Sequence, residues 1–210
     1  MSDLDHPITR QSFAIIDQEL GTHRFTPEEY PVVRRVIHAT ADFEFAQLLH
    51  ISSTAIASGT AALQAGRSIV VDVGMVQQGI RRRVQQTFKN PIHLAVEQVD
   101  AAEPGRTRTE TGLLRCWQRN PEAIYVVGNA PTALLALCRC LAENPPVQPA
   151  LVVGVPVGFV AVEEAKAALA ALSVPQIWVA GRKGGSATAA AIVNALLGIA
   201  WAQAAATPRG

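Results

Sequence analysis

One histidine has sequence neighbours that suit it to proton transfer. His38 lies in the segment His-Ala-Thr-Ala-Asp, so Asp42 follows it at the spacing of one helical turn. An imidazole titrates near neutral pH, and a nearby carboxylate can orient it as a general acid or base. A histidine at the end of an amphipathic helix is also commonly a packing or capping residue, and Asp42 can equally end the helix. The spacing alone leaves both roles open.

Three glycine-containing segments offer backbone amides to an anion. They are GNAPT at 128–132, GVPVGF at 154–159 and GRKGGS at 181–186. In the last segment, two cations stand beside the glycines, and Ser186 is a candidate N-cap for the helix that follows, which favours a bound anion. The spacing matches neither a Walker loop nor the GxGxxG motif. Tight turns with solvated cations are the alternative explanation.

Arginine supplies most of the positive charge, with 15 Arg against three Lys. Arginine binds carboxylates and phosphates through two parallel hydrogen bonds, although a GC-rich genome produces the same bias. The run at 81–83 fits a solvated face, an anionic ligand or an interface. Because 18 basic and 17 acidic residues leave a net charge of only +1, we do not expect a nucleic-acid partner.

The cysteines and remaining histidines form no ligand pattern. Cys116, Cys138 and Cys140 are odd in number, and the last two lie two residues apart in a predicted helix, where they do not face each other. We therefore expect neither a disulfide framework nor a four-ligand zinc site. The remaining histidines, which are scattered without ligand spacing, are His6, His23, His50 and His93.

The scaffold predicted by the apolar pattern is α/β. Apolar runs of strand length, each closed by Gly, Pro or Asp, alternate with Ala- and Leu-rich stretches of helix length. This pattern is typical of a mainly parallel sheet with helices on both faces, in three layers. The expected strands are 48–52, 68–72, 92–96, 123–127, 150–153 and 176–179. The expected helices are 55–65, 106–119, 131–143, 162–172 and 187–202.

Two further helices are expected before the sheet. Residues 9–20 place apolar side chains on one stripe and stop at Gly21, and the capping box at 26–29 opens a helix that runs to Ala41. No linker or repeat divides the chain. With 49% hydrophobic residues, we expect one domain over 1–210, with its core at about 6–200.

The apolar run at 187–206 is long enough to span a membrane. It consists mainly of alanine, which is weakly hydrophobic, and it includes Thr188, Asn194 and Gln203. A buried C-terminal helix is therefore favoured over a tail anchor, and no membrane partner is expected. The acidic start MSDLDHPITR has no apolar h-region, which favours a cytoplasmic protein over a secreted one.

Several segments, taken together, resemble the precorrin-8X methylmutase family of cobalamin biosynthesis. They occur in the same order and spacing and span roughly residues 6–197. The segments are HPITRQSF (6–13), RVIHATADFEFA (35–46), DVGMVQQGI (72–80), GRTRT (105–109), GNAPTAL (128–134), GVPVGFV (154–160) and GRKGGSATAAAIVNALL (181–197).

The resemblance implies an isomerase that moves a methyl group from C11 to C12 of a corrin precursor. The substrate is then precorrin-8X, giving hydrogenobyrinic acid, or cobalt-precorrin-8, giving the cobalt-containing cobyrinic acid. The family's catalytic histidine falls on His38, where an imidazolium would protonate the macrocycle, and its substrate-binding serine falls on Ser12. The resemblance implies no cofactor and a homodimer with substrate near the subunit interface. The low charged fraction, 17%, also favours an oligomer.

Further substrate contacts are expected within or beside these segments. The many acetate and propionate groups of such a substrate fit cations and helix-start amides. The expected contacts are Arg10, Thr40, Asp72, Met75, Arg108, Gly128, Asn129, Thr132, Arg182, Lys183, Gly184 and Ser186. Two other functions stay open: a non-catalytic corrinoid carrier, which would not need His38, and a nucleotide-binding α/β enzyme, which would use the glycine loops for phosphate.

Overall fold

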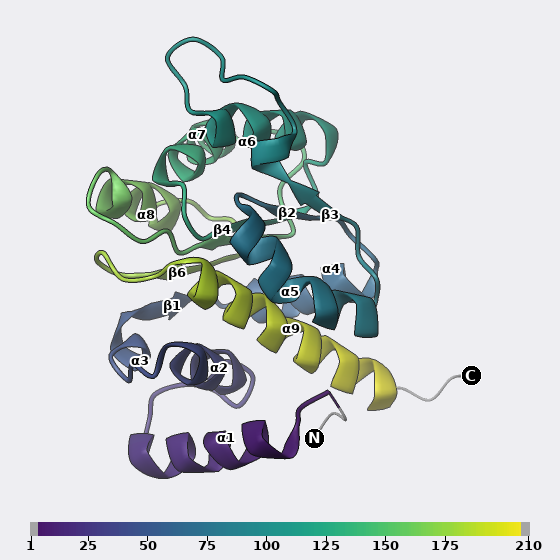
Figure 1. Cartoon of the computed structure of the whole chain (residues 1–210), viewed down its shortest axis with the longest axis vertical. Coiled ribbons are helices and arrows are strands. Elements are labelled where there is room, and N and C mark those ends of the chain that lie inside the picture. Colours follow the sequence, from purple (N-terminus) through teal and green to yellow (C-terminus); the bar gives the residue numbers. More distant parts are fainter. Residues whose placement is uncertain (1–3, 207–210) are drawn as a thin grey trace.

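The described residues form a six-stranded sheet with helices on both faces, as the alternating pattern predicted (Figure 1). The computed structural model describes residues 4–206. The strand order is β1-β6-β5-β4-β2-β3, in which β1 is antiparallel to β6 and the other neighbouring pairs are parallel. The strands are β1 Leu49–Ile51, β2 Ile69–Val71, β3 Ile92–Leu94, β4 Ile124–Val127, β5 Leu151–Gly154 and β6 Gln176–Val179.

Helices connect the parallel strands, since a parallel pair needs a crossover. The five helices predicted to alternate with the strands are confirmed to within a few residues. They are α4 Ala55–Gln64, α6 Arg108–Arg119, α7 Pro131–Ala142, α8 Val162–Ala170 and α9 Ser186–Ala206. The structure adds α5 Gly74–Gln86 and the short 3₁₀ helix η1 Ala95–Glu97. Ser186 is the first residue of α9 and not, as expected, the residue before it.

Alternate residues of the central strands build two separate cores. Ile69, Val71 and Val126 pack with α2, α4, α5 and α9 on one face of the sheet. Val70 and Tyr125, one residue out of phase, pack with α6, α7 and α8 on the other. Successive side chains of a strand point to opposite faces, so strands that are apolar throughout require helices on both. The predicted three layers follow.

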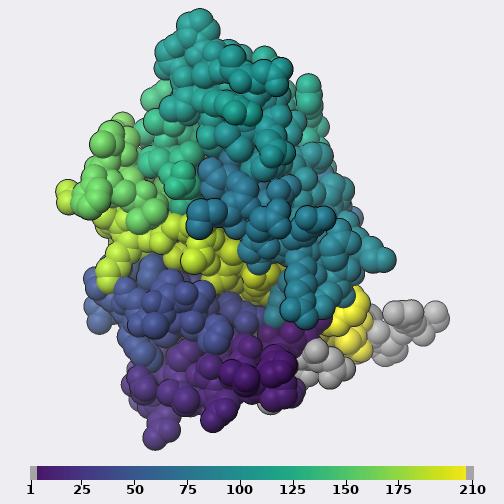
Figure 2. Space-filling view, in the orientation of Figure 1, coloured from purple at the N-terminus to yellow at the C-terminus, as the bar shows by residue number. Residues whose placement is uncertain are grey.

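The N-terminal helices cover the α9 face at one end of the molecule (Figure 2). They are α1 Pro7–Leu20, α2 Tyr30–Thr40 and the single turn α3 Phe45–Leu48. Gly21 ends α1 with φ 62°, and the predicted capping box forms, because the Thr26 hydroxyl accepts from Glu29 N while the Glu29 carboxylate accepts from Thr26 N. Regular helix begins only at Tyr30, since residues 27–29 form a turn.

The long apolar helix α9 is a core helix. By length and composition it could cross a membrane, and half of its most apolar window is buried. It runs across one face of the sheet between α2 and α5 (Figure 1) and also contacts α4. Its alanines let these three helices approach closely, so the predicted buried C-terminal helix is confirmed.

Candidate active site

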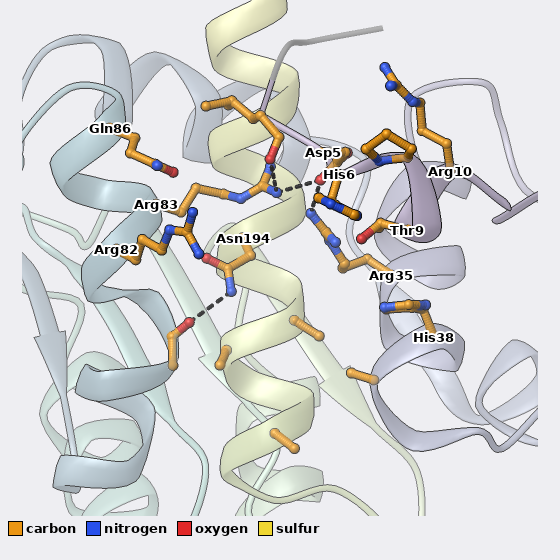
Figure 3. Close-up of a pocket in the computed structure, with 17 residues that line it drawn as sticks. Asp5, His6, Thr9, Arg10, Arg35, His38, Arg82, Arg83, Gln86 and Asn194 are labelled. Carbon is orange, nitrogen blue, oxygen red and sulfur yellow. Dashed lines mark hydrogen bonds and ion pairs between the residues drawn. The ribbon is translucent and has the colours of Figure 1, made fainter. Parts of the chain in front are cut away.

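A pocket of about 900 Å³ lies between α1, α2, α5 and α9, and His38 lines it (Figure 3). One face of α9 supplies Ala187, Ala190, Ala191 and Asn194, which follow each other at helical spacing. The three alanines leave the space, while Asn194 and the elements around α9 supply the polar side chains. Those polar residues are Asp5, His6, Thr9, Arg10, Arg35, His38, Arg82, Arg83, Gln86 and Asn194.

His38 lies in the last turn of α2, one turn after Arg35. Its ring packs edge-on against Phe13 of α1, with centroids 5.4 Å apart. Burial lowers the pKa of His38 below its usual 6.5, and the positive charge of Arg35 lowers it further, whereas Asp5 opposes both effects. The neutral imidazole is therefore favoured in the free protein at pH 7, and a nearby negative charge favours the protonated form.

Asp42 does not orient His38. Ala41 leaves the helix in a left-handed conformation, with φ 53°, so Asp42 is not on the His38 face of α2. Its carboxylate instead accepts from Lys183 Nζ at 2.6 Å and from Glu44 N at 2.9 Å. The other interpretation, that Asp42 ends the helix, is also not what the structure shows, because α2 ends at Thr40 with Ala41 as its C-cap and Asp42 follows that cap.

The cations of the pocket are partly paired and partly free. Asp5 Oδ1 accepts from Arg35 Nη2 at 2.7 Å and from Arg83 Nη2 at 2.5 Å. Arg10 and Arg82 form no ion pair with any residue in the described part of the chain. With four arginines and one carboxylate, the pocket suits a ligand that carries several carboxylates.

Most of these cations were not among the residues predicted from the sequence to contact a ligand. The run at 81–83 was left between three interpretations, and the structure turns Arg82 and Arg83 to the pocket (Figure 3). Gly79, which also lines the pocket, lies one turn before them on α5, and Gln86 lies one turn after. That helical spacing was the available signal, because it marks one polar face beside a small residue.

Two predicted residues, Arg10 and His38, line the pocket, and two others lie on the same helices. The Ser12 hydroxyl donates to Ile8 O at 3.0 Å. The Thr40 hydroxyl donates to Val36 O at 2.9 Å. Both hydroxyls therefore bond their own helix in this structure, and a ligand would have to use their remaining lone pairs.

The second group of predicted residues lies at the carboxyl ends of the strands, where Asp72 has a structural role. Asp72 is fully buried. One carboxylate oxygen accepts from the backbone N–H groups of Gly128, Asn129 and Ala130, at 3.1, 2.6 and 2.9 Å, and the other accepts from Val73 N. The expected direct contact between Asp72 and substrate is not supported, since the carboxylate has no exposed surface. It holds the 128–130 loop in place.

Gly128 and Gly184 are required by close packing. A Cβ on Gly128 would lie 2.9 Å from Ala189 Cβ, so glycine lets the end of β4 meet the start of α9. Gly184 has φ 149°, and a Cβ there would lie 2.3 Å from Val155 O. The backbone conformation and the close contact with Val155 are therefore sufficient to explain why residue 184 is a glycine, whatever ligand the loop binds.

Lys166, which was not among the residues predicted from the sequence, holds the loop that begins at Gly181. Lys166 is 1% exposed, and its Nζ donates to Gly181 O at 2.8 Å and to Lys183 O at 2.6 Å. Burial lowers its pKa to about 8. No carboxylate among residues 4–206 forms a hydrogen bond with Lys166, so these two carbonyls hold its ammonium group. A lone lysine in a helix gives no sequence signal for such a role.

The cations of this loop are already paired. Lys183 Nζ lies 2.6 Å from both Asp42 and Glu44, which ties the loop to the end of α2. Arg182 Nε donates to Glu163 at 3.2 Å, and both side chains are 60% exposed. Ser186, also predicted, is half-buried at the start of α9.

The remaining predicted residues lie beside the strand ends, and their side chains form few hydrogen bonds within the protein. Met75 is 75% exposed at the start of α5, and Asn129 is exposed. The Thr132 hydroxyl is 3.1 Å from that of Thr107, and Arg108 Nε donates to Val99 O at 2.9 Å. These side chains are accessible to a ligand but do not line the His38 pocket.

Comparisons with known proteins agree with one another. The family model described as precorrin-8X methylmutase matches residues 7–199. A cobalt-precorrin-8 methylmutase of Synechocystis sp. is 53% identical over 96% of this chain and 99% of its own length. A precorrin-8X methylmutase of Pseudomonas aeruginosa is 41% identical, over 90% and 93%. A crystal structure of precorrin-8X methylmutase from Thermus thermophilus has a TM-score of 0.84 and 44% identity, covering 93% of this chain and 98% of that one.

Proposed function

Since this chain belongs to the precorrin-8X methylmutase family, the isomerases of cobalamin biosynthesis, we propose that it moves the C11 methyl group of precorrin-8X or cobalt-precorrin-8 to C12, with His38 as proton donor. The observation that carries the assignment of His38 is its position in a pocket of about 900 Å³ that four arginines line. An anionic macrocycle needs such a space, and its carboxylates need such partners.

The reaction is an isomerisation, so His38 needs only to lend a proton. The His38 imidazolium protonates the conjugated macrocycle, and in the resulting tautomer the bond from C11 to the methyl group breaks as the bond to C12 forms. The isomerised ring then loses a proton, and His38 regains one, so that substrate and product have the same composition and oxidation level. General acid catalysis of this kind contributes roughly 10²–10⁴-fold to a rate.

The charge of the substrate prepares His38 for this role. In the free protein, burial and Arg35 favour the neutral imidazole. A bound carboxylate that pairs with Arg10 or Arg82 adds negative charge to the pocket and raises the pKa of His38. Substrate binding thus favours protonation of His38, and protonated His38 favours binding of the anionic substrate.

The test is to compare two histidines of the same pocket. His6 lines the pocket as His38 does, and its Nδ1 accepts from Ile8 N at 3.3 Å to cap α1. His38→Ala should lower kcat at least 100-fold while product binding stays within threefold of the wild type, whereas His6→Asn, which keeps a capping side chain, should stay within tenfold on both. Near wild-type turnover by His38→Ala would contradict the assignment.

The same assay separates the two other functions. A corrinoid carrier would bind the coloured product but convert no substrate in the wild-type protein, and a nucleotide-binding enzyme would do neither. Offering metal-free and cobalt-containing substrate in parallel assays identifies which one this chain uses, because the two corrinoids differ in their visible absorption.

We also propose a homodimer and a cytoplasmic location. Apolar side chains follow the carboxyl ends of β2 and β5, which share one edge of the sheet: Met75, Val157, Phe159 and Val160, the last two 83% and 84% exposed. A second copy would cover them. The burial of α9 in the core supports a protein that is not membrane-anchored.

Arg108 offers a test of a shared site, since it does not line the His38 pocket of its own chain. Light scattering should give twice the chain mass of 22.3 kDa. Mixing a His38→Ala subunit with an Arg108→Ala subunit should restore activity if one site draws on both chains. A monomeric mass would contradict the dimer, and a dimer without restored activity would contradict the shared site.

A further inference from the structure

Among the described residues that line the pocket, Asp5 carries the single carboxylate. Its Oδ1 bridges two arginines from different helices, Arg35 of α2 and Arg83 of α5, at 2.7 and 2.5 Å. The Arg83 and Arg35 side chains are each 13% exposed and that of Asp5 is 21% exposed, so all three groups are largely shielded from water. Shielded pairs interact more strongly than surface pairs, which contribute little.

The position of Asp5 is fixed both by its place in the chain, next to the start of α1, and by its side-chain ion pairs. It directly precedes His6, whose side chain caps α1 and whose carbonyl accepts from the amides of Thr9 and Arg10. Its carboxylate then reaches across the start of the pocket to α2 and α5, as Figure 3 shows. The segment that leads into α1 is thereby held against the two helices that form the pocket walls.

We propose that Asp5 is a positioning residue of the methylmutase reaction: its carboxylate neutralises Arg35, the cation one turn before His38, and so lets His38 carry the proton that the reaction uses. The inference rests on the proposed role of His38. Nothing in the family resemblance or in the residues predicted from sequence pointed to Asp5.

The charges around His38 make this role specific. Its own helix contributes Arg35, α1 contributes Arg10, and α5 contributes Arg82 and Arg83, all of them cations. The α9 residues that line the pocket are uncharged, and the segment before α1 contributes Asp5 and the ring of His6. Asp5 opposes the effect of Arg35 on the pKa of His38. Without Asp5, Arg35 and Arg83 would lose the carboxylate that they share, and no other described pocket residue would offset the effect of Arg35 on His38.

The experiment measures the titration of His38 directly, by NMR of the ring protons in the ligand-free protein. Asp5→Asn keeps the shape and one oxygen acceptor but removes the charge. We expect it to move the titration midpoint of His38 to lower pH, and to lower kcat at pH 7.5 more than at pH 6, because at pH values above the midpoint the protonated fraction falls about tenfold per pH unit. Asp5→Glu, which restores the charge, should recover most of both quantities.

Asp17→Asn is the matched control. Asp17 also joins two N-terminal helices through an arginine, since it accepts from Arg34 Nη1 at 2.8 Å, and it lies outside the pocket. It should destabilise the protein without moving the His38 midpoint. An equal shift in both variants would mean that loosened packing, and not the lost charge of Asp5, is the cause, and would overturn the proposal.

If Asp5→Asn does not fold, the influence of nearby charges on the His38 titration midpoint can be measured with a second variant. Arg35→Gln should move the His38 midpoint to higher pH, and the Asp5→Asn/Arg35→Gln double variant should return it toward the wild-type value, because the two changes oppose each other. An unchanged midpoint in Asp5→Asn, or in Arg35→Gln, overturns the inference. Because these midpoints are measured without substrate, the proposed role of His38 stands or falls separately, on the turnover of His38→Ala.

Discussion

The His38 pocket and the loops at the carboxyl ends of the strands both contain cations, but they use them differently. In the loops, Lys183 is paired with two carboxylates and Arg182 with Glu163. In the pocket, Arg10 and Arg82 form no ion pair with another described residue. A paired cation must break an interaction within the protein to bind a ligand, whereas an unpaired cation gives up only hydrogen bonds to water. Affinity for an anionic substrate should therefore come mainly from the pocket.

The largest effect that this difference predicts is at Arg82. Arg82→Ala removes an unpaired guanidinium and should weaken binding of the corrinoid by roughly 1.5–3 kcal/mol, or about 10- to 150-fold in Kd, because hydrogen bonds to charged groups contribute that much. Titrating the visible spectrum of the product measures it. Arg81→Ala, next to it on α5 but not lining the pocket, is the control and should change Kd less than twofold. An unchanged Kd in Arg82→Ala would contradict the idea that the unpaired cations of the pocket bind the substrate more strongly than the paired cations of the loops.

The next largest effect is a loss of stability when Gly184, in the loop after β6, is substituted. Gly184→Ala should lower the free energy of unfolding by about 1–3 kcal/mol, since the new Cβ lies 2.3 Å from Val155 O and the backbone has φ 149°. Thermal or urea unfolding measures the change. Gly181→Ala has positive φ, 66°, but no atom within 4 Å of its Cβ, so it should cost about 1 kcal/mol or less. Equal losses of unfolding free energy in the two variants would contradict this prediction, because they would mean that the backbone shifts to avoid the contact between the new Cβ and Val155 O.

The sequence predicted the frame of the molecule because the frame depends on local patterns. The apolar runs at Ile69–Val71 and Ile124–Val127 are too hydrophobic for strands exposed on one face, and the helices between them follow from the parallel order. His38, which lines the pocket, could be singled out because the segment around it resembles a known family. The segment before α1 was not singled out, because no local pattern marks a residue whose importance depends on distant partners.

Partners far apart in sequence account for what could not be predicted. Asp5 meets Arg35 and Arg83, 30 and 78 residues away. Lys166 meets the Gly181 carbonyl. Whether a cation is free for a ligand depends on such pairings, which appear only once the chain has folded. The same reason explains Asp42: its spacing from His38 suggested one helix face, and a single left-handed residue between them removed it from that face.

A smaller effect is expected at Lys166, which supports the loop without reaching a ligand. Lys166→Met leaves the carbonyls of Gly181 and Lys183 without their donor, so KM should rise a few-fold, about 1 kcal/mol, while kcat stays within twofold. Lys89→Met, at an exposed position, is the control. A large loss of kcat with unchanged KM would contradict a purely supporting role.

The stability of the wild type relative to Lys166→Met should depend on pH in one direction. The pKa of Lys166 is about 8 in the folded protein and near 10.5 in the unfolded chain, so between these values the unfolded chain binds more protons. The free energy of unfolding of the wild type, relative to Lys166→Met, should therefore rise from pH 8 to pH 10.5 and be constant below pH 8. Urea denaturation of both proteins at several pH values measures this. A relative stability that falls over this range would contradict the sign.

The smallest effect is predicted for Arg182, the most exposed cation of the loops. Its pair with Glu163 is 60% exposed on both sides, and its guanidinium also lies 5.5 Å from the Phe159 ring centroid. Exposed pairs contribute about 0–1 kcal/mol, so Arg182→Ala should change the free energy of unfolding by less than about 1 kcal/mol and the Kd for product less than about threefold. Arg82→Ala is its natural comparison, because the same substitution is made at an unpaired cation. If Arg182→Ala weakened binding as much as Arg82→Ala, the loop would bind carboxylates despite its internal pairs, and the site would extend from the pocket to the strand ends.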